Sequence, residues 1–174
     1  MPPPPSRPPS KAVLDTGPLF TGLTLVYIRQ RPTVRDYVLH EHKLPKYITD
    51  PTTERAFLAF LDSIKEVLTT SHVIGQIKSR RALAPDIYRE FMLSSMDFLS
   101  RKGLSERLVT LLSMREDDNS RRLICTVGPT DAGLVTLARQ ENCLLLTDDN
   151  RLFDCCDNDG KPEVVLARNL LSPY

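Results

Sequence analysis

The chain has 174 residues, which is enough for one domain with a buried hydrophobic core. Hydrophobic residues make up 41% and charged residues 26%, as in an ordinary soluble globular protein. The formal net charge of +1 excludes a globally basic nucleic-acid binder, so any basic surface must be local. No uncharged apolar run reaches the roughly 18 residues of a membrane span. No secretion leader is visible, so we expect a cytoplasmic protein.

The first half of the chain is predicted to begin with a tail and then to alternate strands with helices. Six of the 14 prolines fall in the first eleven residues, which predicts a disordered, partly polyproline tail ahead of a single domain over residues 12–174. In chain order we expect a tail, a strand, a buried helix, a polar helix or turn, and a loop: Met1–Lys11, Ala12–Asp15, Leu19–Ile28, Thr33–His42 and Lys43–Asp50.

A well-marked helix start follows the loop. Asp50 can cap the helix, Pro51 occupies its first position, and Glu54 lies in its first turn. Apolar residues then recur at the i, i+3, i+4 spacing of one buried face: Phe57, Phe60, Leu61, Ile64 and Leu68.

The second half is predicted to continue this alternation. Pro85–Lys102 has the spacing of an amphipathic helix, which Gly103 ends. The other expected elements are a strand passing into a helix over Ser71–Ile77, a helix over Ser105–Met114 with Leu108, Leu111 and Leu112 on one face, a charged loop over Arg115–Arg122, a strand over Leu123–Val127, a polar loop over Asp154–Lys161 and a strand over Val164–Ala167. Such alternation predicts an α/β fold: a three-layer sandwich with a mostly parallel central sheet.

The segment Gly128–Phe153 reads as a turn, a helix, a strand and an acidic turn. Pro129 and Thr130 mark the helix start, with Thr130 as its cap and Asp131 in its first turn. The helix is apolar around most of its circumference, so we expect it to be buried.

Acidic residues follow the two strands that the sequence marks most clearly. Leu144–Thr147 is an all-apolar strand of the kind found inside a parallel sheet, and Asp148 and Asp149 follow it. Asp15 ends the strand near the N-terminus in the same way. Asp131 lies at the start of the helix that precedes the strand Leu144–Thr147, at the other end of the same helix–strand unit. The path of the chain between helix and strand decides whether Asp131 faces Asp148 and Asp149. Open α/β sheets bind ligands at the carboxyl ends of their strands, so these acids are candidate site residues.

These motifs resemble those of PIN-domain ribonucleases, including the VapC-type toxins. The marks of that family are a hydrophobic strand ending in Asp-Thr, an Asp-Ala at a late helix start, and T-x-D after the next strand. In this sequence they are Asp15-Thr16, Asp131-Ala132 and Thr147-Asp148-Asp149. The resemblance is close over Ala12–Phe20 and Gly128–Phe153 and loose between them.

The resemblance implies a PIN-like fold and a metal-dependent endoribonuclease. Asp15, Asp131 and Asp149 would be the catalytic residues and would hold Mg²⁺ or Mn²⁺, with Asp148 as a neighbour that replaces Asp149 or binds through water. By analogy it also implies an RNA substrate, an antitoxin partner and a homodimer. Thr16 and Thr147 would either hydrogen-bond the carboxylates or satisfy the backbone of the turns.

The sequence departs from the family pattern in the middle of the chain. PIN nucleases usually place a Glu in the short helix after the second strand, in a setting like H-V-I-x-E-I. Here the matching segment is His72–Ile77, with Gln76 at the position of the Glu. An amide oxygen can still bind a cation or orient a water, but it carries no charge. We therefore expect weaker metal binding.

Several other polar residues have weaker assignments. Lys78, Arg80, Arg81 and the pair Arg121-Arg122 are candidate contacts to RNA phosphates, with ordinary solvated charge as the alternative. Cys125, Cys143, Cys155 and Cys156 form no C-x-x-C pair, which speaks against zinc and favours reduced thiols. His40, His42 and His72 are too scattered for a ligand set and are expected to be surface or core residues.

Three rival functions are compatible with parts of the sequence. Asp15-Thr16-Gly17 resembles the D-T-G of aspartic proteases, but that chemistry needs two such motifs or a homodimer in an all-β fold. A HAD-type phosphatase would also place an Asp after the first strand, but its acid two residues later is replaced by Gly17. The third rival is a catalytically weakened PIN domain that binds RNA or a protein, and Gln76 is its main support.

Overall fold

The computed structural model describes residues 9–48, 50–79, 83–110, 114–115, 118–157 and 163–170. Within these residues, five strands form one sheet in which every pair of neighbours is parallel. The strands are β1 (Lys11–Leu14), β2 (Glu66–Thr69), β3 (Ser105–Glu106), β4 (Leu144–Thr147) and β5 (Val164–Leu166). The predicted α/β class with a parallel central sheet is therefore confirmed.

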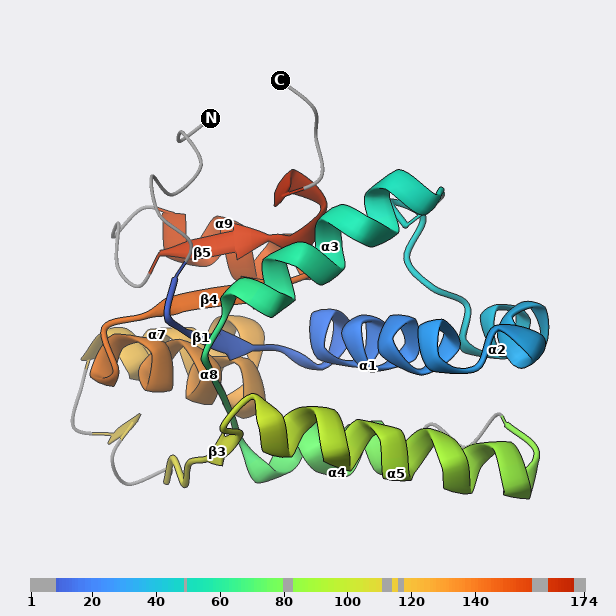
Figure 1. The fold of residues 1–174 in the computed structure, drawn as a ribbon. Coiled ribbons are helices and arrows are strands. Elements are labelled where there is room, and N and C mark those ends of the chain that lie inside the picture. The colour runs from blue at the N-terminus through green and yellow to red at the C-terminus, as the bar shows by residue number, and fades with distance from the viewer. Residues whose placement is uncertain are drawn as a thin grey trace.

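Helices connect the strands and cover the sheet (Figure 1). The described helices are α1 (Thr16–Gln30), α2 (Arg35–His42), α3 (Pro51–Ser63), α4 (Ser71–Ser79), α5 (Pro85–Arg101), α7 (Asp118–Val127), α8 (Pro129–Gln140) and α9 (Asn150–Asp157), with 3₁₀ turns η1 (Pro32–Val34) and η2 (Ala167–Leu170). Of these described helices, none is both long enough and apolar enough to cross a membrane.

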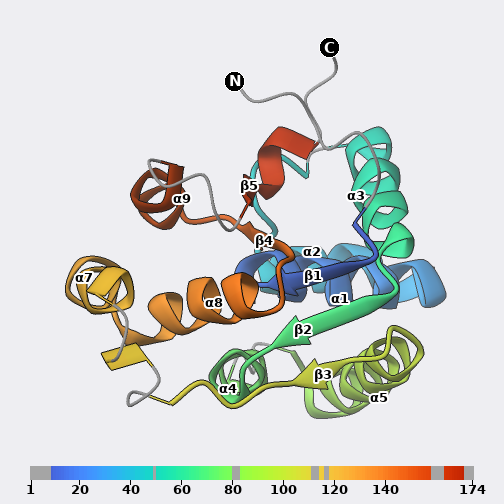
Figure 2. The same ribbon diagram turned by 90° about the vertical axis from the view of Figure 1, so that its left-hand side faces the viewer.

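The order of the strands reverses between β1 and β4. The sheet order is β3-β2-β1-β4-β5, so the chain first builds outward from β1 in one direction and then adds β4 and β5 on the other side. Because crossovers between parallel strands are almost always right-handed, the helices of the two halves belong on opposite faces. Figure 2 shows α7, α8 and α9 on one side of the strands and α3 and α5 on the other. Such a reversal is where open α/β sheets bind ligands.

The two central strands are held in the core. The side chains of β1 from Ala12 to Leu14 and those of β4 from Leu144 to Leu146 are buried. Helix α1 is buried on most of its surface and packs against α3, α5 and β4, while α8 packs against β1, β4 and α7. Burial of this extent fixes the two strand ends with respect to each other, because interiors are close-packed and deform little.

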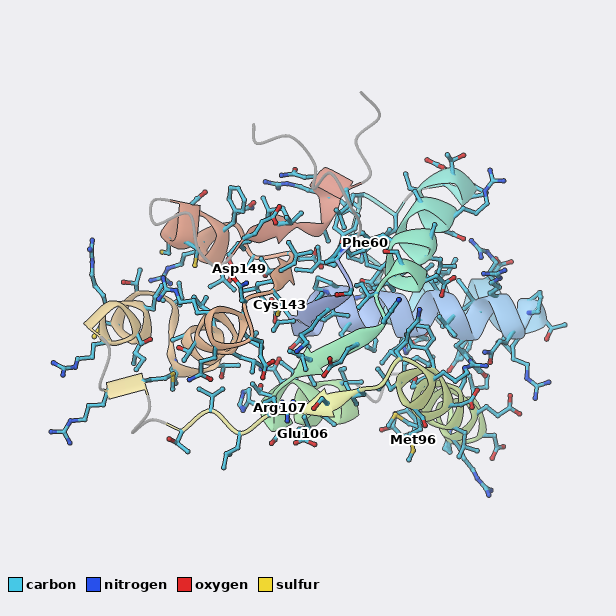
Figure 3. All side chains as sticks on the ribbon, turned by 60° about the vertical axis from the view of Figure 1, so that its left-hand side comes forward. Phe60, Met96, Glu106, Arg107, Cys143 and Asp149 are labelled. Carbon is cyan, nitrogen blue, oxygen red and sulfur yellow. The ribbon has the colours of Figure 1, made fainter. Side chains whose placement is uncertain are left out.

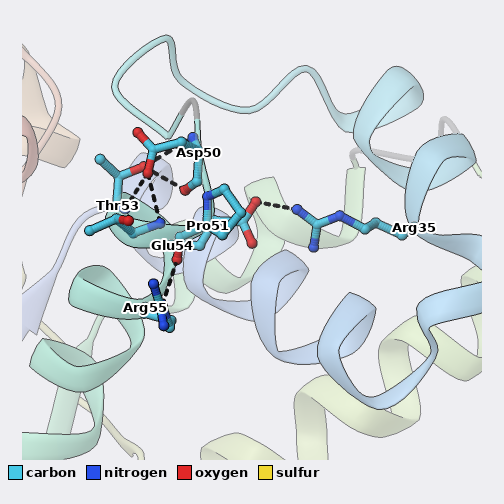
Figure 4. A network of polar contacts seen from close by, with 7 residues as sticks. Arg35, Asp50, Pro51, Thr53, Glu54 and Arg55 are labelled. Atoms are coloured by element: carbon cyan, nitrogen blue, oxygen red, sulfur yellow. Dashed lines mark hydrogen bonds and ion pairs between the residues drawn. The ribbon is translucent and has the colours of Figure 1, made fainter.

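The predicted start of α3 is confirmed (Figure 4). The Asp50 carboxylate accepts hydrogen bonds from the backbone nitrogens of Thr52 (2.7 Å) and Thr53 (3.0 Å), and Pro51 is the first helical residue. Glu54, in the first turn, forms an ion pair with Arg35 of α2. These contacts anchor the end of the loop between α2 and α3, a loop that carries Tyr47.

Most of the predicted helices and strands are found, but the middle of the chain differs. The second strand is Glu66–Thr69 instead of part of Ser71–Ile77, and the latter is helical throughout, with Val73 and Ile77 buried one turn apart. Leu68 therefore belongs to this strand and not to the buried face of α3. For two short apolar runs in succession, periodicity alone does not tell which one is the strand and which is the helix. This explains why the strand was predicted too late in the chain.

Three further predictions are wrong for a similar reason. The predicted helix over Ser105–Met114 begins instead with β3, which pairs with β2 and is followed by a segment without regular secondary structure that exposes Leu108. Leu111 and Leu112 lie outside the described residues. The predicted strand over Leu123–Val127 is the end of helix α7, which also takes up part of the predicted loop before it. The predicted loop over Asp154–Lys161 begins as helix α9, where Leu152 and Cys156 are buried at i, i+4 spacing.

Candidate functional site

Asp15 links the first strand to the later half of the chain. It caps α1, because its Oδ1 accepts a hydrogen bond of 2.5 Å from the backbone nitrogen of Thr16. Its Oδ2 accepts a second hydrogen bond of 2.7 Å from the hydroxyl of Thr147, which ends β4. Asp15 is thus a helix cap and also a carboxylate at the point where the strand order reverses.

Asp149 lies at the start of the next helix (Figure 3). Its Oδ1 accepts hydrogen bonds from the backbone nitrogens of Arg151 (2.7 Å) and Leu152 (3.4 Å) in the first turn of α9. Its own backbone nitrogen donates to the hydroxyl of Thr147 at 3.0 Å. The fully buried Thr147 therefore bonds both the Asp15 carboxylate and the turn backbone, which were the two roles considered for it.

Asp131 lies in the first turn of α8 and shares the environment of the other two acids. Its pKa is raised to about 6, first by burial and then by the negative charges of Asp15 and Asp149, while the charge of His72 lowers it. The sequence left open whether Asp131 faces the other acids. A helix that returns the chain to a parallel strand begins at that strand's carboxyl edge, which places Asp131 on the same side of the sheet as Asp148 and Asp149. The three predicted ligands therefore converge.

The capping prediction for this helix needs a correction. The cap residue of α8 is Gly128, whose φ of 96° suits a residue without a Cβ, and Pro129 is the first helical residue. Thr130 is therefore inside the helix and not its cap. All three acids thus lie at helix N-termini, where the positive end of the helix dipole offsets part of their mutual repulsion.

Asp148 is held differently from the other acids. Its Oδ1 accepts a hydrogen bond of 2.5 Å from the hydroxyl of Tyr47. Its Oδ2 lies so close to the first turn of α1 that a Cβ at Gly17 would be 2.5 Å away from it. Burial raises the pKa of Asp148, the Tyr47 hydrogen bond lowers it, the charge of Asp15 raises it, and that of Arg168 lowers it. Burial likewise raises the pKa of the Tyr47 phenol.

Gln76 reaches the site through Thr16. The Thr16 hydroxyl donates a hydrogen bond of 2.5 Å to Oε1 of Gln76, which places the amide one residue away from Asp15. Gln76 lies on α4, the short helix after the second strand. The basic residues that follow it cannot be placed in the same way, because the side chain of Lys78 and the whole of Arg80 and Arg81 lie outside the described residues.

Sequence reasoning missed four residues near these acids: Tyr47, Thr70, His72 and Arg168. Thr70 follows β2, and the pairing of Val13 with Leu68 places Thr70 level with Asp15 on the neighbouring strand. Its hydroxyl oxygen is buried and has no hydrogen-bond partner among the described residues. Placing the second strand at Glu66–Thr69 would have revealed Thr70 and His72, whereas nothing in the local sequence marks Tyr47 or Arg168.

The remaining candidates stay outside this cluster. The four cysteines are free thiols, and His42 packs in the core between the rings of Phe20 and Phe91. His40 and the pair Arg121-Arg122 are exposed. In the part of the chain that the structure describes, no group of three or more His, Cys, Asp or Glu side chains is placed closely enough to hold a metal ion.

Gly17→Ala and Gly75→Ala form a matched pair that tests how Asp148 is packed. A Cβ at position 17 would meet Asp148, whereas a Cβ at position 75 meets nothing within 4 Å. We expect Gly17→Ala to lower the free energy of unfolding by about 1 kcal/mol, the usual scale of overpacking. Gly75→Ala should raise it by about 0.5–1 kcal/mol through helix propensity. Urea denaturation measures both, and shifts of the same sign would contradict the observed contact.

The raised pKa of Asp131 predicts how stability varies with pH in metal-free solution. The pKa of about 6 in the folded state exceeds the value of 3.8 expected for the unfolded chain, so the folded protein binds the proton more tightly. This contribution to stability is complete below about pH 4 and is lost as the pH rises through about 6. Asp131→Asn, which does not titrate, should therefore gain stability relative to the wild type over that interval.

The measurement is urea denaturation in EDTA at several pH values between about 4 and 7.5. Asp97→Asn is the control, since Asp97 is exposed and pairs only with Arg101 among the ion pairs of the described residues. Its difference from the wild type should stay flat across the interval. A flat difference for Asp131→Asn as well would show that Asp131 is not crowded by other acids.

Comparison with known proteins adds no assignment to this geometry. No protein-family model matches the sequence, and no curated protein sequence matches it. The arrangement of the aspartates and the chemistry of their neighbours are therefore the basis on which a function can be proposed.

Proposed function

We propose that this protein is a divalent-metal-dependent endoribonuclease that cleaves RNA phosphodiester bonds. The observation that supports the proposal is that Asp15 and Asp149 meet at the reversal of strand order, where their charges also raise the pKa of Asp131. Asp15 and Asp149 come from segments more than 130 positions apart, yet Thr147 touches both of them. The repulsion within a cluster of acids, which raises the pKa of Asp131, costs folding free energy, and functional sites tolerate such a cost.

The donor set fits a hard divalent cation. Mg²⁺ and Mn²⁺ prefer oxygen ligands, and Mg²⁺ keeps several of its waters, so a few carboxylates suffice. The repulsion that raises the pKa of Asp131 would be relieved by a bound cation. The buried Thr70 hydroxyl, without a partner among the described residues, adds an oxygen next to Asp15 that a water could satisfy.

Each protein group has a definable part in this chemistry. When bound, the ion supplies positive charge for the phosphate oxygens and makes a water more acidic. Asp15, Asp131 and Asp149 would hold it, and the Thr147 hydroxyl orients the Asp15 carboxylate toward β4. Tyr47 holds Asp148 beside this set, and the Thr16–Gln76 hydrogen bond fixes the side of the site formed by α4.

The choice of RNA as substrate rests on the resemblance to PIN-domain ribonucleases. The resembling motifs supply the three acids that the fold brings together, and the parallel three-layer architecture agrees with that family's fold. An antitoxin partner, a homodimer and a cytoplasmic location belong to the same analogy with VapC-type toxins, and they stand as parts of this proposal.

A second function is favoured by one specific contact. Gln76, at the position where the family pattern has a Glu, has no charge, and its oxygen already accepts the Thr16 hydroxyl. A domain with this substitution could bind RNA or a protein without cutting it. The two functions differ in their need for a cation, so metal titration separates them.

Charge-neutral variants of the acids test the nuclease. Purified protein should cut a labelled RNA in Mn²⁺ and leave it intact in EDTA. Asp15→Asn should lower the rate by about 100-fold or more, since even indirect support of a metal ligand is worth 10–100-fold. Asparagine caps helices as well as aspartate does, so this variant keeps the start of α1. Asp131→Asn should behave alike, while the exposed Asp97→Asn should cut at the wild-type rate.

These comparisons can reject the proposal residue by residue. Cleavage that persists in chelator would mean that the reaction uses no divalent cation or comes from a contaminant. Full activity in Asp131→Asn would remove that residue from the mechanism.

Gln76→Glu tests whether the missing charge limits the site. A carboxylate can accept the Thr16 hydroxyl as the amide does, so the contact should persist while one negative charge is added. We expect tighter Mn²⁺ binding by calorimetry and faster cleavage. An unchanged affinity for Mn²⁺ would show that position 76 lies outside the metal centre.

A further inference from the structure

Arg168 leaves the sheet beside the aspartates of β4. Strand β5 pairs with β4 in parallel, with Leu166 opposite Thr147. Arg168, in η2, lies two residues beyond Leu166, and Asp149 lies two residues beyond Thr147, so both residues follow the carboxyl ends of these neighbouring strands. The residue is far from the acids in sequence, and the register of the last strand brings it to the same edge of the sheet.

The guanidinium of Arg168 is anchored at this position. Its Nη2 donates a hydrogen bond of 2.5 Å to Oδ1 of Asn150, the residue directly after Asp149 and the first of α9. Its positive charge also interacts with the acid cluster, since it lowers the pKa of Asp148. The side chain is nevertheless exposed to solvent. A cation is thus held at the rim of the candidate metal centre.

Arg168 forms no ion pair with a carboxylate within the part of the chain that the structure describes. The ion pairs found there involve other basic residues, although Asp148 and Asp149 are close by. A guanidinium has five N–H donors in a planar fork that matches two oxygens of a phosphate, and one of its nitrogens is accounted for by Asn150. Its remaining donors can therefore serve a ligand from solvent.

We propose that Arg168 forms a phosphate subsite beside the metal centre and binds the RNA backbone next to the bond that is cut. This inference rests on the proposed nuclease function, and it names the group that holds the substrate while the carboxylates hold the cation. A chain of negative phosphates needs such a cation, because the aspartates alone repel it. Contacts to phosphate carry no sequence information, so Arg168 contributes equally to all RNA sequences.

The alternative is that Arg168 only compensates the charge of the aspartates. The two roles differ in what a neutral substitution changes. Loss of a compensating charge would alter the acid cluster and its affinity for metal. Loss of a phosphate ligand would weaken RNA binding and its dependence on salt, because each phosphate contact releases counterions.

The test compares Arg168→Gln with Arg101→Gln in the full chain. Arg101 is also exposed and lies at the end of α5, so its substitution makes the same change in net charge outside the site. Binding of a fluorescent single-stranded RNA is measured by anisotropy in EDTA, where a metal-dependent enzyme leaves the RNA intact. Arg168→Gln should raise Kd about tenfold and lower the slope of log Kd against log salt by about one. Arg101→Gln should match the wild type.

Two further readouts keep the outcome specific. Arg168→Lys retains the charge without the planar fork and should restore the salt slope with partial recovery of Kd. Calorimetry with Mn²⁺ alone should show that Arg168→Gln binds the ion as well as the wild type, whereas tighter binding would indicate that Arg168 only compensates the charge of the aspartates. In Mn²⁺, the KM for RNA cleavage should rise more than kcat falls.

The results separate this inference from the nuclease itself. If the wild type cuts RNA and Arg168→Gln equals Arg101→Gln in Kd and salt slope, the phosphate subsite is refuted and the nuclease stands. If the wild type binds RNA through Arg168 but never cuts it, the subsite stands and the nuclease falls. A wild type that binds no RNA in either EDTA or Mn²⁺ would overturn both.

Discussion

The parallel pairing of β1 with β4 is the constraint on which the site depends. Parallel strands leave the sheet at the same edge, so the turn after each strand delivers its residues to one place. Because the strand order reverses here, no crossover covers this edge between β1 and β4. The hydrogen bond of 2.7 Å from Thr147 to Asp15 is the direct result, since it joins the ends of the two strands. Neither half of the chain could form the site alone.

Holding several carboxylates together has an energetic cost that the fold offsets unequally. Asp15 and Asp149 accept backbone hydrogen bonds as helix caps. For Asp131 the described contacts include no cap, and its pKa is the one raised to about 6 by burial and by its neighbours. The repulsion among the acids is thus visible in the raised pKa of Asp131. A cation bound there would stabilise the folded state, because binding to the folded protein alone adds to its stability.

The sequence was sufficient to find residues that are marked by their local surroundings. It was insufficient to find residues whose place near the site depends on how the strands pair. Asp15, Asp131 and Asp149 could be chosen as candidates because each lies beside a strong helix or strand marker. The second strand was misplaced because EVLT and SHVIGQI are both short apolar runs, and only the pairing of Val13 with Leu68 decides between them. Tyr47 and Arg168 reach the site from a loop and from a short 3₁₀ turn, where periodicity carries no information.

The neutral residue at position 76 is best understood together with Asp148. The resemblance leads one to expect an acid on α4, but there Gln76 accepts a hydrogen bond and adds no charge beside Asp15. Asp148, in contrast, does carry a charge near Asp15. It is packed against Gly17, its carboxylate is held by Tyr47, and the charge of Asp15 raises its pKa. The site thus still holds four carboxylates, with the fourth on β4's turn instead of α4. A fifth acid at position 76, beside Asp15, would add to the repulsion among these carboxylates, so a neutral amide there is consistent with the charge that the site contains.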